Sequence, residues 1–362
     1  MSFRATGVHI FAGSFTVGIE QAGFDVVALY ENLGLGVETA RQNFNCPILF
    51  PKEQWHNYLP KNISLVYGNP PCSAFSRMGL NRGTSDPINN CMYECANLAM
   101  SLNPDIFIME SVPGLYTHGQ KILDDFDRMF SDYQHTYLFS DSVLHGSPQV
   151  RPRFHYIASK FDFKLAKFNP DIVPTIRDAI WDLRLIPEGP NNHVSARISG
   201  QLESLIENIP NGITAADIWR IAPHLRDPNF GQPFGPTRRA AWDAPGSTIT
   251  GGPTIIHPDF DRFITVRESA RIFGYPDTFT FTGNVANQYA QIGKAVTVYM
   301  GNFLGRCARK TLQAEERITS KNKFIDLLPY TEKAKDYQKL AWYGRIERGS
   351  KLKMLENYFG QV

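Results

Sequence analysis

The sequence predicts an α/β protein that combines a doubly wound, mostly parallel sheet with a smaller, irregular second region. Within the first 160 residues, strand-like apolar runs alternate with helix-like segments, a pattern typical of parallel strands joined by crossover helices. Residues 160–250 lose this alternation and are rich in Pro, Gly, Asn and Arg. A length of 362 residues suits two domains, or one large domain with an insertion.

Each expected element has a local signal. Strands are expected at short apolar runs, namely residues 7–11, 25–31, 63–68, 105–110, 135–144 and 153–159. A helix is expected over 17–23, where a glycine ends it, and another over 264–279, which a proline ends. Apolar spacing of about 3.6 residues predicts one long helix over 289–312, and the charged tail after Arg317 is expected to be helical in parts.

Composition narrows the class of protein. Hydrophobic residues make up 43% and charged residues 20%, which is ordinary for a globular chain. The chain has no run of about 18 apolar residues and no signal-peptide segment near its start, so we expect no membrane span and a cytoplasmic location. Five scattered cysteines without a CxxC pair predict neither a disulfide framework nor a zinc site, and we expect no bound metal.

The net charge of +2 is unevenly distributed along the chain. Residues 306–362 contain 13 Lys and Arg against 7 Asp and Glu. Such a basic tail can contact nucleic acid, and a solvated helical surface is the alternative.

Residues with catalytic chemistry follow several of the expected strands. Gly13, Glu31, Cys72 and Glu110 all stand at carboxyl ends of strands, where doubly wound sheets bind their ligands. Two prolines precede Cys72, and such a stiff loop can hold a nucleophilic thiol, although an inert buried cysteine has the same appearance. Glu110 can serve as an acid where burial raises its pKa, and a surface glutamate is the alternative.

Two further patterns suit a nucleotide-like ligand. Arg151 and Arg153 share one face of a strand, where two guanidiniums can hold a phosphate, a carboxylate or a carbonyl edge. An ordinary basic strand edge would look the same. Phe11 precedes Gly13, and Glu31 follows that glycine after 18 residues, as in sites for nucleoside cofactors.

Taken together, these segments resemble the cytosine-C5 DNA methyltransferases over roughly residues 7–305. The matching segments, in chain order, are HIFAG, LYEN, GNPPCSAFS, MESVPG, SPQVRPRF, TVRESARIFGYPDTF and QIGKAVTVYMGNFLG. The resemblance implies the mostly parallel fold of S-adenosylmethionine-dependent methyltransferases. It also implies a catalytic and cofactor-binding domain at 1–160, a target-recognition region at 161–250, a return to the catalytic domain at 251–317 and a basic tail, helical in part, at 318–362.

The resemblance implies roles for individual residues. Cys72 corresponds to the nucleophile that adds to C6 of a flipped-out cytosine, and Glu110 to the acid that contacts N3 and N4. Arg153 corresponds to the arginine that holds the cytosine carbonyl, with Arg151 as its helper. The cofactor residues are expected to be Phe11, Gly13, Ser14, Glu31, Asn32, Pro71, Lys294, Ala295 and Val296. DNA contacts are expected from Ser76, Arg238 and Arg239, with double-stranded DNA as the partner of a monomeric protein.

Four positions depart from the family pattern. Residues 13–16, Gly-Ser-Phe-Thr, replace Gly-x-Gly-Gly, which should narrow or reshape the cofactor pocket. Ser73 replaces a glutamine, and residues 47–55 hold no clear counterpart of the acid that takes the adenine amine. Lys294 replaces an asparagine that faces the methionine end of the cofactor. An ammonium there would repel the sulfonium of S-adenosylmethionine but pair with the carboxylate of carboxy-S-adenosylmethionine.

The leading hypothesis is a DNA cytosine-C5 alkyltransferase that transfers carboxymethyl from carboxy-S-adenosylmethionine and forms 5-carboxymethylcytosine. The alternative is an ordinary DNA (cytosine-5-)-methyltransferase that uses S-adenosylmethionine. Further alternatives are a tRNA cytosine-C5 methyltransferase and a catalytically dead DNA-binding regulator. A restriction-modification enzyme, a solitary regulator and a phage-encoded DNA modifier all fit the same residues.

Overall fold

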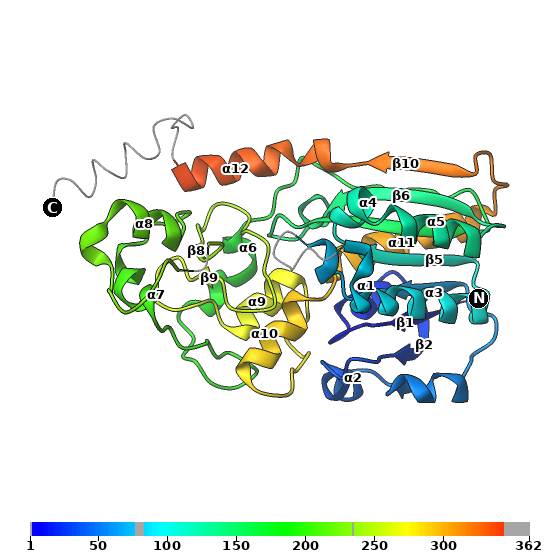
Figure 1. The fold of residues 1–362 in the computed structure, drawn as a ribbon, viewed down its shortest axis with the longest axis horizontal. Helices are drawn as coiled ribbons and strands as arrows, with labels where there is room; N and C mark the ends of the chain where they lie inside the picture. The colour runs from blue at the N-terminus through cyan, green and yellow to red at the C-terminus, as the bar shows by residue number, and fades with distance from the viewer. Residues whose placement is uncertain (1, 77–82, 234, 344–362) are drawn as a thin grey trace.

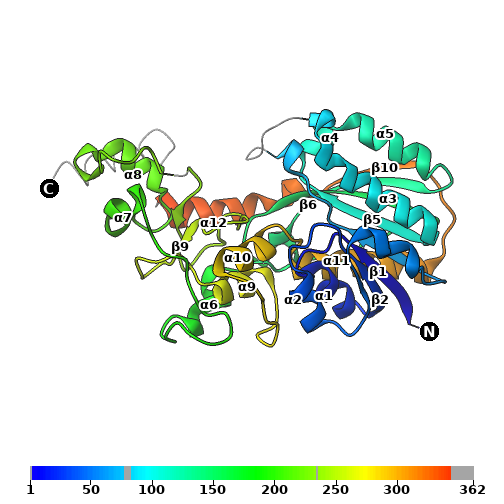
Figure 2. The same cartoon turned by 60° about the horizontal axis from the view of Figure 1, so that its bottom comes forward.

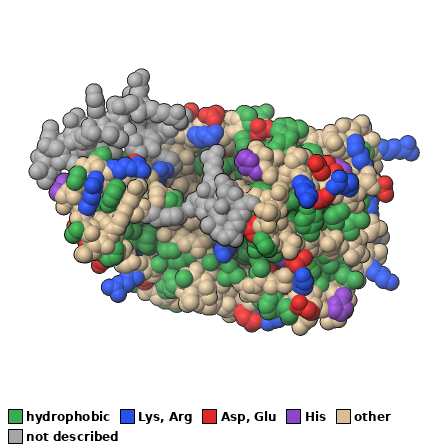
Figure 3. Space-filling view, viewed as in Figure 1, with side chains coloured by type: hydrophobic (Ala, Val, Ile, Leu, Met, Phe, Trp, Pro, Cys, Tyr) green, Lys and Arg blue, Asp and Glu red, His purple; other side chains and the backbone are tan. Residues whose placement is uncertain are grey.

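The computed structural model describes residues 2–76, 83–233 and 235–343. Figure 1 shows two lobes, with a large sheet and its helices on one side and a smaller lobe of short helices on the other. The helices of the described ranges include none that is both long and apolar enough to cross a membrane. Lys and Arg side chains are scattered over both lobes on the face shown in Figure 3 rather than gathered in one patch.

The larger lobe is built on a sheet of eight strands within the described ranges, in the order β10-β6-β7-β5-β4-β1-β2-β3. The strands are β1 (Phe3–Val8), β2 (Phe24–Tyr30), β3 (Ile48–Leu49), β4 (Leu65–Gly68), β5 (Ile106–Ser111), β6 (Gln134–Asp141), β7 (Pro152–Ser159) and β10 (Asn322–Asp326). Neighbouring strands are parallel, except that β7 runs antiparallel to β5 and β6. The predicted doubly wound, mostly parallel sheet is confirmed.

Helices cover both faces of this sheet (Figure 2). The helices of this lobe are α1 (Ser14–Gln21), α2 (Val37–Asn43), α3 (Asn90–Leu102), α4 (Gly114–His118), α5 (Gln120–Met129) and α11 (Val298–Ala314). In β5, Ile106 and Ile108 join the apolar core that includes α1 and α11, whereas Phe107 and Met109 join the core that includes α3 and α5. A strand buried on both faces therefore appears in the sequence as a continuous apolar run.

The smaller lobe consists of short elements around its own apolar cluster. Its elements are α6 (Ile176–Ile180), α7 (Gln201–Leu205), α8 (Ala215–Ile221), β8 (Arg238–Arg239), β9 (Ile255–Ile256), α9 (Val266–Phe273) and α10 (Val285–Gly293). Leu205, Ile218 and Phe263 are members of the cluster. Short helices with loops between them explain why residues 160–250 lack a clear periodic pattern.

Three predicted elements end at different places in the structure. The helix expected over 264–279 ends at Phe273, because Gly274 takes a left-handed φ of 90° before the proline is reached. The strand expected over 7–11 ends at Val8, because His9 and Phe11 both have a positive φ of 52° and turn the chain. The single helix expected over 289–312 is divided, since α10 ends at Gly293 and α11 begins at Val298. The side chain of Thr297 caps α11 by accepting a hydrogen bond from the backbone of Met300, which starts a new helix there.

The tail after Arg317 is only partly helical. Strand β10 pairs in parallel with β6 at the edge of the main sheet, and α12 (Glu332–Tyr343) follows it. Gln338 of α12 donates hydrogen bonds to the carbonyls of Pro245 and Gly246 in the smaller lobe. The tail is thus an integral part of both lobes up to α12, and residues 344–362 lie outside the described residues.

Candidate active site

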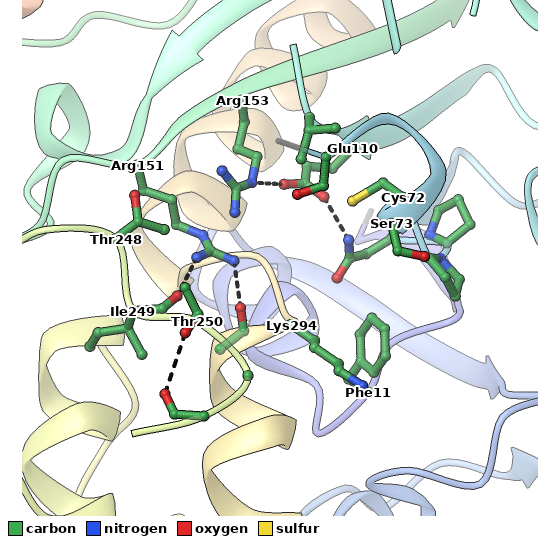
Figure 4. A pocket seen from close by; sticks show the side chains of 18 of the residues that line it. Phe11, Cys72, Ser73, Glu110, Arg151, Arg153, Thr248, Ile249, Thr250 and Lys294 are labelled. Carbon is green, nitrogen blue, oxygen red and sulfur yellow. Dashed lines mark hydrogen bonds and ion pairs between the residues drawn. The ribbon is translucent and has the colours of Figure 1, made fainter. Parts of the chain in front are cut away.

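A cavity of about 680 Å³ lies at the carboxyl edge of the sheet, and both lobes line it. The loop after β4 brings Cys72, β5 brings Glu110 and β7 brings Arg153 (Figure 4). The junction between α10 and α11 brings Lys294, and the loop of residues 248–254 closes the opposite wall. Predicted strand-end residues therefore do meet at one edge of the sheet, as doubly wound topology requires.

Glu110 is held by two side chains from different strands. In the antiparallel register of β5 and β7, Ser111 lies opposite Phe154, so the start of β7 sits beside the end of β5. The Nε atom of Arg153 is 2.7 Å from Oε1 of Glu110. Asn69 donates from Nδ2 to Oε2 at 2.6 Å, so both carboxyl oxygens have a fixed partner. The sequence reasoning missed Asn69, although it too directly follows a strand.

The carboxyl of Glu110 is suited to carrying a proton. Its side chain is buried, and burial raises its pKa, while the charges of Arg153 and Arg151 and the hydrogen bonds from Arg153 and Asn69 act in the opposite direction. Desolvation prevails, so the pKa lies above that of an ordinary glutamate. A protonated carboxyl at the wall of a cavity can donate to a ring nitrogen.

Cys72 lies in the same cavity with a thiol that resists ionisation. Burial and the nearby carboxyl of Glu110 together raise the pKa of this thiol to about 11, against the opposing charges of Arg153 and Arg151. The residue immediately precedes a short 3-10 turn, Ser73–Phe75, which fixes the loop. At neutral pH the thiol is therefore protonated, and an attack by Cys72 requires that it lose this proton.

Arg151 holds the walls of the cavity together. It is buried, and Nη1 donates to the carbonyl of Ile249 at 2.8 Å. Nη2 donates to the carbonyls of Gly293 at 2.9 Å and Ala295 at 2.8 Å, on either side of Lys294. The guanidinium that was expected to help hold a cytosine is thus occupied by backbone carbonyls, and its place in the structure is that of a positioning residue.

Gly293 allows the two walls to approach closely. A Cβ atom at this position would lie 1.7 Å from the carbonyl oxygen of Thr250, which no side chain can tolerate. The glycine therefore lets the loop of residues 248–254 pack directly on the end of α10. The loop carried no signal in the sequence that linked it to the site, whereas Gly293 belongs to the matching segment QIGKAVTVYMGNFLG, although no role was assigned to it.

Three of the expected cofactor residues, Phe11, Pro71 and Lys294, line the cavity. The exposed side chain of Lys294 passes over Gly251 and ends beside the ring of Phe11 (Figure 4). Within the described ranges it makes no hydrogen bond or ion pair. An ammonium that has no partner among the described residues of a ligand-sized cavity is available to an anion.

Glu31 and Asn32 lie behind Phe11. The carboxylate of Glu31 is buried and accepts hydrogen bonds from the backbone N–H groups of Phe11 at 3.1 Å, Asn32 at 2.8 Å and Leu33 at 3.1 Å. Asn32 donates from Nδ2 to Glu94 at 3.0 Å. Glu31 therefore fixes the loop that carries Phe11. Gly13 precedes α1 with a φ of 96°, which favours glycine.

The side chains of residues 14–16, which were expected to reshape the cofactor pocket, do not line the cavity. Ser14 is buried, and its hydroxyl donates to the carbonyl of Val296, another expected cofactor residue. The ring of Phe15 packs on Tyr67 with 4.8 Å between centroids, and the Tyr67 hydroxyl donates to Thr16 at 2.9 Å. All three side chains turn into the core because α1 packs its first turn against the sheet. Ala295 is likewise buried.

The three expected DNA contacts differ in their positions. Ser76 lines the cavity, and Arg238 is half-buried. Arg239 is buried, and its guanidinium donates to carbonyl oxygens of residues 206, 209, 257 and 260. Arg239 therefore stabilises the smaller lobe from within and does not present its charge to DNA, which corrects the prediction for this residue.

The chain is similar to known DNA methylases over most of its length. The family described as "C-5 cytosine-specific DNA methylase" matches residues 7–309. The chain is 27% identical to the type II methyltransferase M.Eco47II of Escherichia coli, over 83% of this chain and 78% of that protein. It is 26% identical to a putative type II methyltransferase, M.MJ0563P, of Methanocaldococcus jannaschii, over 83% of this chain and 97% of that protein.

Solved structures show the same fold. A putative DNA modification methyltransferase encoded within an E. coli prophage aligns with a TM-score of 0.64 at 21% identity, covering 86% of this chain and all of that one. The Dnmt2 methyltransferase of S. pombe aligns with a TM-score of 0.56 at 14% identity, covering 86% of this chain and 99% of that one.

Proposed function

The chain belongs to the C-5 cytosine-specific DNA methylase family, and from this premise we propose that it alkylates C5 of cytosine in double-stranded DNA through a covalent adduct with Cys72. The observation that supports this proposal most directly is the cluster of Cys72, Glu110 and Arg153 in one cavity. A base inside a duplex cannot reach such a cavity, so the target cytosine has to leave the stack.

In the proposed reaction, this cluster makes C5 of cytosine nucleophilic. The thiol of Cys72 releases its proton to solvent and its sulfur adds to C6, while Glu110 delivers its own proton to N3, which leaves C5 with the character of an enamine. Arg153 uses Nε on Glu110 and Nη1 on the carbonyl of Pro152, and within the described ranges Nη2 has no partner. Nη2 is therefore the donor that we assign to the cytosine carbonyl. After alkylation a solvent molecule takes the C5 proton, the C6–S bond breaks to release Cys72 as a thiolate, and the N3 proton returns to Glu110.

The residues of the cavity fit an S-adenosylmethionine-like donor. A volume of about 680 Å³ lies in the range of sites that enclose small organic ligands, and Phe11 and Leu33 offer apolar surface for a flat heterocycle. Bound there, the donor would supply an electrophilic carbon attached to a sulfonium. The residues that we assign to holding it are Phe11, Pro71 and Lys294, with Glu31 supporting the loop of Phe11.

Trapping with 5-fluorocytosine tests the proposal. Fluorine at C5 cannot leave as a proton does, so a functional enzyme with donor should remain covalently attached to duplex DNA of mixed sequence. Cys72→Ala should give no adduct, and the matched variant Cys46→Ser, remote from the cavity, should give as much as the wild type. No wild-type adduct would favour a catalytically dead regulator, and adduct on tRNA but not duplex DNA would move the substrate to RNA. Either result would overturn the proposal.

Lys294 favours a second candidate, in which the donor is carboxy-S-adenosylmethionine and the product 5-carboxymethylcytosine. The supporting observation is the unpaired ammonium that ends beside Phe11, where a carboxylate on the transferred carbon could form a charge-assisted hydrogen bond. Supplying both donors together and measuring the product nucleosides by mass tests it. A product that contains 5-methylcytosine alone would overturn this candidate and leave the ordinary methyltransferase.

A further inference from the structure

We propose that His9, Cys91 and Glu94 form a binding site for a zinc-like divalent cation behind the wall of the cavity. The ligand atoms of these three side chains all lie within 4.8 Å of one another. His9 follows β1, while Cys91 and Glu94 stand three residues apart on α3 and so share one helix face. None of the three lines the cavity of the proposed active site.

The imidazole of His9 provides an independent observation. It is completely buried, and neither ring nitrogen makes a hydrogen bond within the part of the chain that the structure describes. Nε2 lies 3.7 Å from Oε2 of Glu94, and Nδ1 lies 3.5 Å from Oε1 of Glu31. Buried polar atoms almost always make hydrogen bonds, so a ring whose two nitrogens make none with the described residues and lie beside two carboxylates is expected to have a further partner.

The ligand set favours zinc over magnesium or calcium. A thiolate, an imidazole and a carboxylate suit a borderline ion, whereas magnesium and calcium prefer oxygen ligands alone. In a tetrahedral site with bonds of about 2.0–2.3 Å, adjacent ligand atoms lie roughly 3.3–3.8 Å apart. The observed cluster needs to contract by about 1 Å to reach this geometry, which side-chain rotations can provide. Water can take the fourth position because Glu94 is partly exposed.

A cation that binds this cluster has to displace the proton of Cys91 and the ammonium of Lys52. Burial and the carboxylates of Glu94 and Glu31 raise the pKa of Cys91 to about 11, so the ion has to displace the thiol proton to solvent. Lys52 lies 2.5 Å from Oε1 of Glu94 and would oppose a cation. Its exposed side chain can turn away into water. Glu94 would then bind the ion through Oε2, which also accepts a hydrogen bond from Nδ2 of Asn32 at 3.0 Å and has a second lone pair for the cation.

A cation at this site would also act on the loop of Phe11. With Nε2 bound to the ion, the remaining ring proton of His9 sits on Nδ1 and points to Glu31, an arrangement that commonly orients metal-bound histidines. Glu31 in turn accepts the backbone N–H of Phe11, which lines the cavity. The ion would thus rigidify one wall of the donor site, and this consequence rests on the proposed function.

Cobalt absorption tests the site without any cofactor or DNA. Co²⁺ added to the full chain after chelator treatment should give, at one equivalent, a thiolate-to-cobalt charge-transfer band and the visible bands of tetrahedral cobalt, and Zn²⁺ should abolish both. Cys91→Ser should lose the charge-transfer band, and the control Cys46→Ser should keep it. Glu94→Gln, a conservative change at a partly exposed position, should weaken cobalt binding at least tenfold and decides the case if Cys91→Ser does not fold.

Several outcomes would overturn the site: no tetrahedral cobalt spectrum in the wild type, a charge-transfer band that survives Cys91→Ser, or unchanged affinity in Glu94→Gln. A separate titration with S-adenosylhomocysteine measures the effect on the donor wall. Zinc-loaded protein should bind it several-fold more tightly than metal-free protein, and equal affinities would refute the connection through Glu31. Because the cobalt spectrum needs no donor, it stands apart from any failure of the proposed alkyl transfer.

Discussion

Replacing Lys294 by asparagine separates the two candidate donors by a single charge. Both S-adenosylmethionine and carboxy-S-adenosylmethionine carry the same sulfonium, so any repulsion between that sulfonium and Lys294 cancels in the ratio of their kcat/KM values. The ratio therefore isolates the attraction between the ammonium and the extra carboxylate. Lys294→Asn removes this attraction, keeps a hydrogen-bond donor and restores the residue that the family has at this position.

The position of Lys294 sets the size of the effect. Two opposite unit charges about 4 Å apart attract by about 1 kcal/mol in water and about 4 kcal/mol at the effective dielectric near a protein surface. Lys294 is exposed within an open cavity, so the attraction lies between these limits. Since about 1.4 kcal/mol corresponds to tenfold, Lys294→Asn should move the donor ratio toward S-adenosylmethionine by roughly 5-fold to several hundred-fold.

The assay is a competition between both donors on one plasmid, with 5-methylcytosine and 5-carboxymethylcytosine quantified by mass spectrometry. Lys61→Asn is the matched control, because Lys61 is exposed and precedes β4, at the edge of the sheet away from the cavity. It should leave the ratio unchanged. A change of less than twofold in Lys294→Asn, equal to that in Lys61→Asn, would refute the reasoning that this ammonium selects the donor.

Three further predictions concern the acid, the buried arginine and the tail. Glu110→Gln should lower kcat at least a hundredfold because an amide cannot protonate N3, and an unchanged rate would reject Glu110 as the acid. In the wild type, kcat/KM should rise with pH up to the raised pKa of Glu110 and then stay level, because the reaction needs a protonated Glu110 and an ionised Cys72. It should fall only above about pH 11, where Cys72 is also ionised. Arg151→Lys should lower the free energy of unfolding in urea by about 3 kcal/mol, because one ammonium nitrogen cannot occupy the positions of the two guanidinium nitrogens that donate to three backbone carbonyls. Loss of activity without loss of stability would instead mean a direct contact with substrate. Truncation after Tyr343 removes four Lys and Arg residues and two Glu residues. Fewer phosphate contacts should make the DNA-binding constant depend less steeply on salt concentration. An unchanged salt dependence would mean that this segment does not contact phosphates.

Local signals predicted the strands and the residues at their ends. Continuous apolar runs such as β5 indicate strands that are buried on both faces, and parallel order then places Cys72 and Glu110 at one edge. The same rule did not predict which end of β7 lies at the site. Because β7 is antiparallel to β5, its first residues, rather than its last, lie at that edge. Arg151 and Arg153 were assigned to the site because of the resemblance to the family, and the direction of the strand did not predict it.

Contacts between distant segments could not be predicted. Arg151 was expected at the substrate, yet it binds carbonyls 98, 142 and 144 residues away in the chain. No local pattern specifies such partners, because they depend on how the loop of residues 248–254 packs on α10. The same holds for the tail, where a strand of five residues with alternating exposure joins the sheet only because β6 offers a free edge.

The position of residues 14–16 sharpens the meaning of Lys294. Three of the four departures from the family pattern were expected to lie at the cofactor: the glycine replacements, the missing adenine acid in residues 47–55, and Lys294. Two of the three, the glycine replacements and Lys294, add larger side chains. In the structure the side chains of residues 14–16 point into the core. The hydroxyl of Ser14 donates to the carbonyl of Val296, the ring of Phe15 packs on Tyr67, and Thr16 accepts a hydrogen bond from the Tyr67 hydroxyl. Of these two departures only Lys294 faces the cavity, so a single substitution at Lys294 is enough to test whether donor choice was changed. If Lys294→Asn leaves the ratio as it was, no change in residues 14–16 is available to explain a preference for the carboxylated donor.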